Sequence, residues 1–337
     1  MSAATVPRLS VVIPTHRRRG YVVDTVDSLR GQTLPTSAFE VVVVCDGDFD
    51  GTEEALGKLT TPFPLKVLVQ AQSGPAAARN RGVAESTADI VVFLDDDILA
   101  APELLAEHLE AQSGNRARVV VGRLLPDPTL RAKGWTLWEQ HYFDRRYAVI
   151  GPGMGIVDGR KFYSGNASVA RAAFEAVGGF NTAYQRAEDI ELGYRLQSWG
   201  ADLVFNGRAA CVHRGVHSFD GWCRIQYIYG RCDVLMADIH GGAQPIPFAR
   251  WFGSRNMLNR AFCRLGVDRP RLSRVLLAGW RAVAAVADGV RAIPVSRWSY
   301  SAIANLHYWQ GVADELGGRD QLWKVVRAPL QGRTVTE

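Results

Sequence analysis

The stretch Val91-Val92-Phe93-Leu94-Asp95-Asp96-Asp97 places three carboxylates directly after four apolar residues. The apolar residues are typical of a buried strand, and the aspartates follow where that strand should leave its sheet. Clustered carboxylates raise one another's pKa unless a positive charge lies among them. A divalent cation with oxygen ligands, Mg²⁺ or Mn²⁺, would supply that charge. The alternative is an acidic helix entry, because Asp is also favoured there.

Short apolar runs alternate with helical segments along the first part of the chain. Strands are expected at 9–14, 40–44, 65–70 and 90–94, and helices at 21–29, 53–59 and 75–82. This alternation predicts an α/β fold with a doubly wound, mostly parallel sheet and helices on both faces. Strands buried on both faces read as continuous apolar runs, as these do. Ligands of such sheets bind outside the carboxyl ends of the strands, which is where the three aspartates fall.

The second part of the chain changes character twice. Residues 125–163 hold Trp135, Trp138 and other aromatics among Gly and Pro, which indicates a loop. Its aromatics would either wall a substrate pocket or pack the loop onto the sheet. Beyond Phe219 the pattern is wholly helical, with helices expected near 220–238, 248–265, 271–292 and 299–316. We therefore expect a catalytic domain at 1–218 and a helical region at 219–337.

The positive charge of the chain is concentrated in this helical region. Residues 216–337 carry 16 Lys and Arg against 9 Asp and Glu, whereas the whole chain has a net charge of +5. The segment Val275–Ile293 is amphipathic and could lie on an anionic membrane surface or cover the sheet domain. Arginines that merely cover helix surfaces are the simpler alternative. Nucleic acid is not an expected partner, because no finger, basic zipper or RNA-binding signature is present.

The five cysteines form no C-x-x-C pair, which is typical of free thiols in a reducing cytoplasm. The segment Met1–Val6 lacks the features of a signal peptide, and no apolar run reaches the ~18 residues of a membrane span. The sequence therefore indicates a cytoplasmic protein. Its basic helical tail could make peripheral contact with the inner face of the plasma membrane.

Six motifs follow one another along the chain. They are Ser10–Thr15, Asp46-Gly47, Ala78-Arg79-Asn80-Arg81-Gly82, Asp95–Asp97, Gly165-Asn166 with Gly178-Gly179-Phe180, and Glu188-Asp189. In this order they resemble the motifs of the family 2 glycosyltransferases, which are inverting enzymes with the GT-A fold. The resemblance covers about residues 9–215. One departure is Cys45, which stands where many members carry a second aspartate.

The resemblance implies a nucleoside-diphosphate sugar as donor, with a UDP-sugar as the first candidate. The residues expected to bind it are Pro14, Thr15, Asp46, Arg79, Asp95 and Asp96. Asp97, together with Asp95, would hold Mg²⁺ or Mn²⁺ on the diphosphate, and His213 is a further candidate ligand or else a structural histidine.

On the acceptor side, the resemblance implies that Asp189 is the general base for a single inverting displacement. Glu188 would position the acceptor or simply favour the start of its helix. Gly165, Asn166, Trp135 and Trp138 are the other acceptor-side candidates. The acceptor itself could be a glycan, a lipid-linked saccharide or a small molecule.

Two other functions compete with sugar transfer. A sugar-phosphate nucleotidyltransferase would share the sheet and the acidic site, but the loop Thr15–Gly20 has too few glycines for its phosphate cradle. A catalytically inactive nucleotide-sugar-binding protein is the second alternative, which the retained Glu188-Asp189 pair disfavours. A dinucleotide dehydrogenase is disfavoured because no G-x-G-x-x-G follows the first strand.

Overall fold

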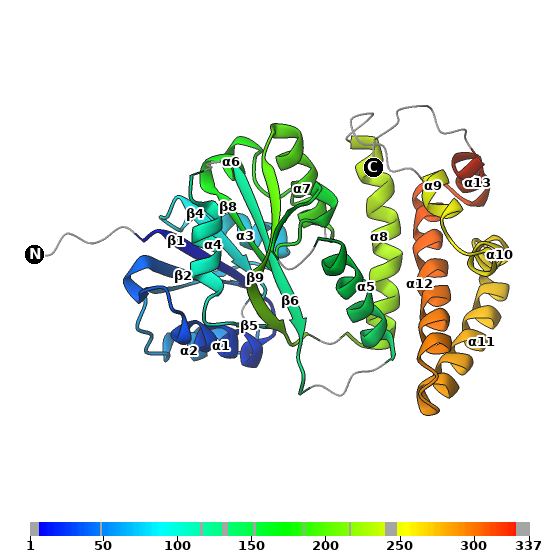
Figure 1. Cartoon of the computed structure of the whole chain (residues 1–337), viewed down its shortest axis with the longest axis horizontal. Coiled ribbons are helices and arrows are strands. Elements are labelled where there is room, and N and C mark those ends of the chain that lie inside the picture. The colour runs from blue at the N-terminus through cyan, green and yellow to red at the C-terminus, as the bar shows by residue number, and fades with distance from the viewer. Residues whose placement is uncertain are drawn as a thin grey trace, which may run out of the picture. The chain divides into compact units, whose positions relative to one another are not determined.

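The structure is a computed structural model, and it describes residues 7–47, 49–114, 117–129, 134–150, 153–184, 186–215, 217–239 and 248–327. The chain divides into two compact units (Figure 1). Unit 1 comprises residues 1–131 and 143–215, and unit 2 comprises 132–142 and 216–337. The second division lies close to the expected boundary at 218/219, whereas the sequence did not indicate that 132–142 would join the helical unit.

Unit 1 is built on one nine-stranded sheet of order β3-β2-β1-β4-β8-β6-β9-β5, with β7 paired to β9. The expected parallel arrangement holds for β3, β2, β1 and β4, while β8 runs antiparallel to both its neighbours and makes the whole sheet mixed. The strands are β1 (Leu9–Thr15), β2 (Phe39–Asp46), β3 (Leu65–Gln70), β4 (Ile90–Leu94), β5 (Ile98–Ala100), β6 (Arg118–Pro126), β7 (Met154–Ile156), β8 (Asn166–Ala170) and β9 (Asp202–His213).

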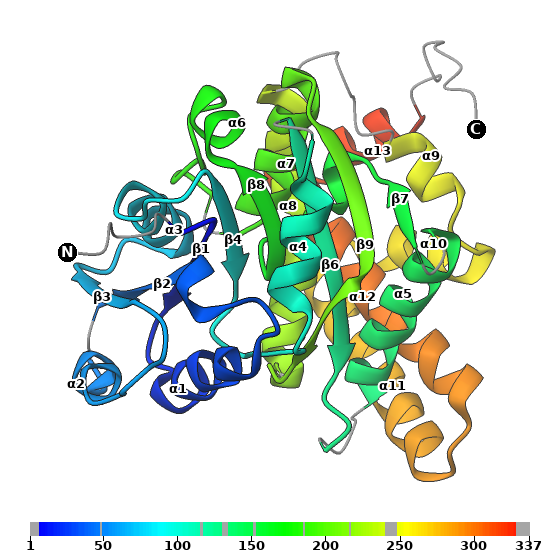
Figure 2. The same cartoon turned by 60° about the vertical axis from the view of Figure 1, so that its left-hand side comes forward.

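Helices cover both faces of this sheet, and alternate residues of each central strand face the two layers. Ile13 packs with α1 (Arg19–Ser28), α2 (Thr52–Gly57) and α4 (Leu104–Gln112), and Figure 2 shows α4 lying along the sheet. Val12 packs with α3 (Pro75–Ala84), α6 (Arg171–Ala176) and α7 (Glu188–Trp199). Each fully buried Val, Leu or Ile contributes roughly 1.5–3 kcal/mol to the free energy of folding, so the contacts in both layers stabilise the packing of the helices on the sheet.

The strand directions bring the functional segments to one edge. Strands β1, β4, β6 and β9 end there, and the antiparallel β8 begins there. The short apolar runs at 203–206 and 209–213 predict two strands, but the structure has one strand, β9, with a register shift opposite Gly122 and Arg123 of β6. This irregularity bends β9 without breaking it, and carries its last residue, His213, to the same edge.

Unit 2 is helical, as the sequence predicted. Its helices are α8 (Phe219–Ile239), α9 (Phe248–Gly253), α10 (Met257–Gly266), α11 (Pro270–Gly289), α12 (Ile293–Glu315) and α13 (Arg319–Arg327). Gly230 and Gly311 let α8 and α12 approach closely, because a Cβ at either would collide with the backbone of the other helix. The predicted helix at 248–265 is two helices, since the Asn256 side chain caps α10 by accepting a hydrogen bond from the Asn259 N–H at 2.8 Å.

The predicted loop at 125–163 is wrong in its central part, because residues Gly134–Ile150 form the helix α5. No Gly or Pro interrupts residues 135–150, so nothing stops a helix there, but aromatics on all sides hide its period. The division between the units falls within α5. Among the helices of the described ranges, none is both long and apolar enough to cross a membrane.

Candidate functional site

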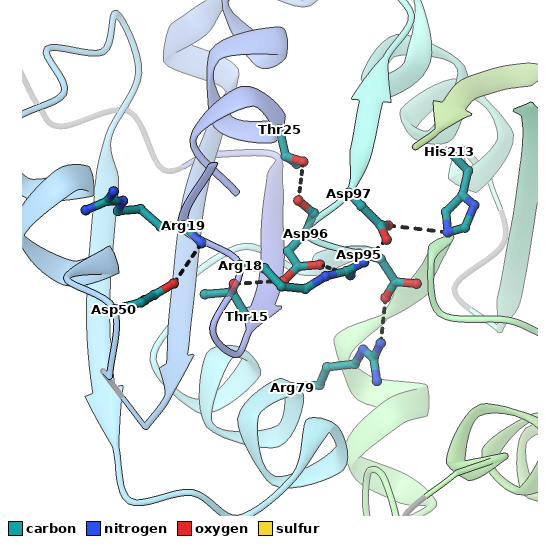
Figure 3. Close-up of polar contacts among 10 residues, drawn as sticks. All are labelled: Thr15, Arg18, Arg19, Thr25, Asp50, Arg79, Asp95, Asp96, Asp97 and His213. Carbon is teal, nitrogen blue, oxygen red and sulfur yellow. Dashed lines mark hydrogen bonds and ion pairs between the residues drawn. The ribbon is translucent and has the colours of Figure 1, made fainter. Parts of the chain in front are cut away.

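Asp96 lies at the centre of the site and is buried by the end of β1 (Figure 3). The Thr15 hydroxyl donates to Asp96 Oδ2 at 2.8 Å, and the Thr25 hydroxyl donates to the Asp96 carbonyl oxygen at 2.7 Å. Burial raises the pKa of Asp96 to about 6; the Arg18 guanidinium opposes this rise and the neighbouring Asp97 adds to it. Asp96 and Thr15 therefore fix the turn after β4 more than they offer free oxygen atoms to a ligand.

Arg18 is a site residue that the sequence reasoning missed. Its Nη1 lies 2.7 Å from Asp96 Oδ1 and 2.8 Å from Asp97 Oδ2, and 37% of its side chain is exposed. The only sequence signal was the basic loop Thr15–Gly20 directly after the first strand. Because the carboxyl ends of β1 and β4 are adjacent, a cation in the loop after β1 can reach the aspartates that follow β4.

Asp97 and His213 form the part of the site that could hold a metal. The register pairs Ile98 of β5 with His213 of β9, which brings His213 Nε2 to 3.4 Å from Asp97 Oδ1. Asp97 is buried, and its Oδ1 accepts no hydrogen bond from the described residues. Gly215 is required here, since a Cβ at that position would collide with Asp97 Oδ2.

A buried carboxylate oxygen without a donor fits a hard divalent cation such as Mg²⁺ or Mn²⁺. Among the described residues, no three His, Cys, Asp or Glu side chains form a complete metal cluster. Such ions commonly take one or two protein carboxylates and complete their shell with substrate phosphates and water. Asp97 with His213, and the more exposed Asp95 beside them, fit such a shared site.

Arg79 connects the aspartates to the start of α7. From the buried face of α3, its Nη2 donates to Asp95 Oδ1 at 2.7 Å and its Nη1 to Glu188 Oε1 at 2.8 Å. Arg79 and Glu188 are both buried, so their pair lies in a medium of low dielectric constant, whereas the Asp95 side chain is 36% exposed. Removing one partner of a buried pair typically costs about 3–5 kcal/mol, because the other charge stays buried and unpaired.

Asp189 is the second residue of α7 and lies beside this ion-pair chain. Its Oδ1 accepts a hydrogen bond from the Ile190 N–H at 2.7 Å. Burial and the adjacent Glu188 carboxylate raise the pKa of Asp189 to about 7, against the opposing Arg79 guanidinium. Ala187, directly before them, has a left-handed φ of 61°, a conformation that costs a non-glycine residue roughly 1–3 kcal/mol. A carboxyl that titrates near neutrality suits a general base.

Asp46 is placed at the same edge of the sheet but is engaged by the protein itself. Its Oδ1 accepts hydrogen bonds from Gln70 Nε2 at 2.8 Å and the Ser73 N–H at 2.7 Å, and its Oδ2 from the Gly74 N–H at 2.8 Å. These bonds hold the entry to α3. Pro14, the penultimate residue of β1, is likewise buried beside Val44 of β2. Asp46 has free lone-pair capacity left chiefly on Oδ2.

The two predicted acceptor-side residues of unit 1 differ in what they contact. A Cβ at Gly165 would lie 2.6 Å from Asp95 Oδ2, so glycine makes room for that carboxylate. Asn166 is 0% exposed, and its Oδ1 lies 2.8 Å from His108 Nε2, while Nδ2 donates to the Ala209 carbonyl oxygen at 2.9 Å. Asn166 therefore joins the sheet to α4 in a buried polar network, and its side chain does not reach a surface where an acceptor could bind.

Trp135 and Trp138 belong to unit 2 and pack among its helices. Trp135 Nε1 donates to the His217 carbonyl oxygen at 3.1 Å, and Trp138 Nε1 donates to Ser301 Oγ at 2.8 Å. The rings make edge contacts with Tyr300 and Trp222, respectively. Of the predicted residues, unit 1 thus brings together Thr15, Asp46, Arg79, the three aspartates, Gly165, the Glu188-Asp189 pair and His213. The two tryptophans serve the core of unit 2.

The chain is similar to known sugar transferases. Residues 10–174 match the family model described as glycosyl transferase family 2. The chain is 31% identical over 225 residues to a validoxylamine A glucosyltransferase of Streptomyces hygroscopicus. The aligned region covers 59% of this chain and 53% of that protein. It is 26% identical over 230 residues to a glucosyl-dolichyl phosphate glucuronosyltransferase of Haloferax volcanii. This aligned region covers 61% of this chain and 69% of that protein. The chain spans about half the length of the first of these relatives.

Solved structures share the fold. A mannosyltransferase from Pyrobaculum calidifontis in complex with GDP-Man and Mn²⁺ has a TM-score of 0.63 at 20% identity, over 93% of this chain and 88% of that one. A fragment of TarS from S. aureus in complex with UDP has a TM-score of 0.54 at 17% identity, over 92% of each chain. These likenesses confirm the predicted GT-A fold with a C-terminal helical region. Residues 10–174 therefore form a glycosyl transferase family 2 domain.

Proposed function

We propose that this protein transfers a sugar from a nucleoside-diphosphate donor to an acceptor hydroxyl with inversion of configuration. The observation that carries this proposal is the ion-pair chain from Asp95 through Arg79 to Glu188. These contacts link the acidic edge, where a metal would bind, to the start of α7, where burial raises the pKa of Asp189 to about 7. Inverting transfer requires both groups, one to stabilise the leaving diphosphate and one to accept a proton.

The donor would lie across the carboxyl ends of β1, β2 and β4, near Pro14, Thr15 and Asp46. Asp97, with Asp95 and His213, would hold a divalent cation, Mg²⁺ or Mn²⁺. When bound, that cation stabilises the negative charge that develops on the leaving diphosphate. A UDP-sugar remains our first candidate donor, while the structural neighbours carry UDP in one case and GDP-Man in another.

In the proposed reaction the acceptor oxygen attacks the anomeric carbon from the face opposite the diphosphate. The bond from that carbon to the diphosphate oxygen breaks, and Asp189 takes the proton of the acceptor hydroxyl. Only the ionised Asp189 can act as the base, so activity should rise with pH through about 7. Glu188 would act on Asp189 through its charge and through its pair with Arg79.

The acceptor and the location of the protein are proposed more broadly, as a glycan, lipid-linked or small-molecule acceptor reached from the cytoplasm. The helices α11 and α12 support a peripheral membrane contact. Val286, Val290 and Trp298 are 67%, 71% and 63% exposed there. Exposed arginines accompany them at 271, 274, 281 and 291. An apolar helix face flanked by cations is typical of segments that lie on anionic lipid, here the inner face of the plasma membrane.

A thermal-shift series tests the proposed donor site. The protein is melted with UDP, GDP, CDP and ADP, each with and without Mn²⁺. We expect one or two nucleotides to raise the melting temperature, and more so with the metal, because a ligand at a hundredfold excess over Kd stabilises by about 2.7 kcal/mol. No shift with any pair would contradict nucleotide-sugar binding. Binding without turnover of a sugar nucleotide would favour the inactive binding protein, and consumption of a nucleoside triphosphate with a sugar phosphate would favour the nucleotidyltransferase.

A further inference from the structure

Two arginine side chains form ion pairs with the aspartate triplet in the part of the chain that the structure describes, and their surroundings differ. Arg79 is buried on α3 and is held from both sides by Asp95 and Glu188. Arg18 lies in the loop after β1, and a single nitrogen, Nη1, contacts both Asp96 and Asp97. Figure 3 shows the Arg18 side chain extending to Asp96 and Asp97, and 37% of this side chain is exposed. One cation is thus fixed within the protein, whereas the other has room to leave.

Arg18 also contacts the same carboxylate that the proposed metal requires. Asp97 Oδ2 lies 2.8 Å from Arg18, while Asp97 Oδ1 faces His213 and accepts no hydrogen bond from the described residues. A divalent ion at Asp97 would bring a second positive centre close to the guanidinium. Two cations at one carboxylate repel each other, so metal binding at Asp97 is expected to be weaker while Arg18 keeps this contact.

We propose that Arg18 is an exchangeable counter-ion, which neutralises Asp97 in the free enzyme and moves to the donor diphosphate when metal and nucleotide bind. This inference rests on the proposed function. The planar guanidinium pairs with phosphate oxygens as readily as with carboxylates. Nucleotide therefore offers Arg18 a new anionic partner and frees Asp97 for the metal. The consequence is cooperative binding: each ligand strengthens the other, partly through Arg18.

The alternative role for Arg18 is a fixed structural contact. Its second carboxylate, Asp96, is already held by Thr15, and Arg18 stacks over the Tyr21 ring with its Cζ 5.0 Å from the ring centroid. If Arg18 only supports the turn, its removal would loosen the triplet and weaken metal binding. If Arg18 competes with the metal, its removal would strengthen metal binding in the absence of nucleotide. The two roles thus predict changes of opposite sign.

The experiment measures Mn²⁺ affinity by electron paramagnetic resonance, with and without a saturating nucleoside diphosphate found in the thermal-shift series. The proteins are the wild type, Arg18→Gln, Arg18→Lys and the matched control Arg19→Gln. The control loses the same charge one residue later, where the Arg19 side chain points away from the triplet in Figure 3. Melting temperatures check that each variant is folded.

For Arg18→Gln we expect Mn²⁺ alone to bind about tenfold more tightly than to the wild type, since a nearby repelling charge is removed. In this variant, the factor by which nucleotide increases Mn²⁺ affinity should be about tenfold smaller than in the wild type. Nucleotide without metal should bind to the variant more weakly than to the wild type. Arg18→Lys keeps the charge and should bind Mn²⁺ alone as weakly as the wild type, and Arg19→Gln should match the wild type throughout.

Unchanged or weaker Mn²⁺ binding by folded Arg18→Gln would overturn the inference and leave the proposed function intact, provided that the wild type binds both ligands. A wild type that binds neither Mn²⁺ nor any nucleoside diphosphate would overturn the proposed function and the inference with it. Equal effects of Arg18→Gln and Arg19→Gln would also overturn the inference, because the loss of charge in the loop alone would then explain them.

Discussion

Substitution of Glu188 by Gln should move the pH dependence of activity to lower pH. Burial, Glu188 and Arg79 are the main influences on the pKa of Asp189, which they set at about 7. Gln keeps the size of Glu188 but removes a negative charge beside Asp189. It also releases the guanidinium of Arg79 from its 2.8 Å ion pair, which leaves more of its positive charge to stabilise ionised Asp189. Both changes lower the pKa of Asp189.

The size of the change follows from the position of the two carboxyl groups. A charge within about 4–6 Å typically moves a carboxyl pKa by about 1–3 units. Asp189 is largely buried but keeps some exposure to solvent, which screens the charge of Glu188, so we take the lower end of this range, about one unit. The pKa should therefore fall from about 7 to about 6, a change of about 1.4 kcal/mol. At pH 6, the ionised fraction of Asp189 would rise from about one-tenth to about one-half.

The assay is kcat/KM for nucleoside-diphosphate release from the sugar nucleotide between pH 5 and 9, which reports the pKa of the free enzyme's base. For the wild type, kcat/KM should fall on the acidic side with a midpoint near pH 7. For Glu188→Gln, the midpoint should lie near pH 6, even if the highest kcat/KM of this variant is lower. Glu175→Gln is the matched control, because that side chain is exposed on α6. A limb that does not move, or that moves to higher pH, would refute the electrostatic reasoning.

Three further predictions concern other parts of the structure. Arg79→Met should lower the free energy of unfolding by about 3 kcal/mol in urea denaturation, because it leaves Glu188 unpaired at a buried position and Asp95 unpaired at a partly exposed one; a loss below about 1 kcal/mol would contradict the ion-pair chain. Gly165→Ala should lower the melting temperature modestly, because its Cβ would displace the partly exposed Asp95 carboxylate beside Arg79, and should weaken Mn²⁺-dependent nucleotide binding; unaltered titration curves would argue against a role for Asp95. Val286→Glu should reduce co-sedimentation with anionic vesicles, whereas Ile156→Glu, an equally drastic change at an 89% exposed position of unit 1, should not; failure of the wild type to sediment would contradict the proposed membrane contact.

Much of the site could be predicted because each functional segment directly follows an apolar strand. The aspartates follow β4, Thr15 ends β1 and Asp46 ends β2, and the carboxyl ends of these parallel strands must share one edge. Arg79 and Glu188 needed the resemblance as well, since 109 residues separate the two partners of their 2.8 Å contact. Local pattern cannot pair residues that are so distant in the chain.

The remainder depended on contacts that leave no local signal. Asn166 looked accessible beside Gly165, but period-2 alternation turns its side chain away from the edge and towards His108 of α4, 58 residues earlier. Burial lowers the pKa of His108 to about 4, so this histidine is neutral and its network is purely structural. Arg18 lies 78 residues before its partner Asp96, and nothing in a basic loop distinguishes it from Arg17 or Arg19.

The most direct test of sugar transfer compares the wild type with Asp189→Asn. The substrate is the sugar nucleotide whose nucleoside diphosphate stabilises the protein most, with Mn²⁺ present, and the readout is nucleoside-diphosphate release. We predict metal-dependent release by the wild type and a loss of roughly 10²–10⁴-fold for Asp189→Asn, because the proton acceptor is removed. Nucleotide affinity should stay within about twofold, since Asp189 takes no part in donor binding. Release by Asp189→Asn at the wild-type rate, or none from the wild type with any sugar nucleotide, would contradict the account.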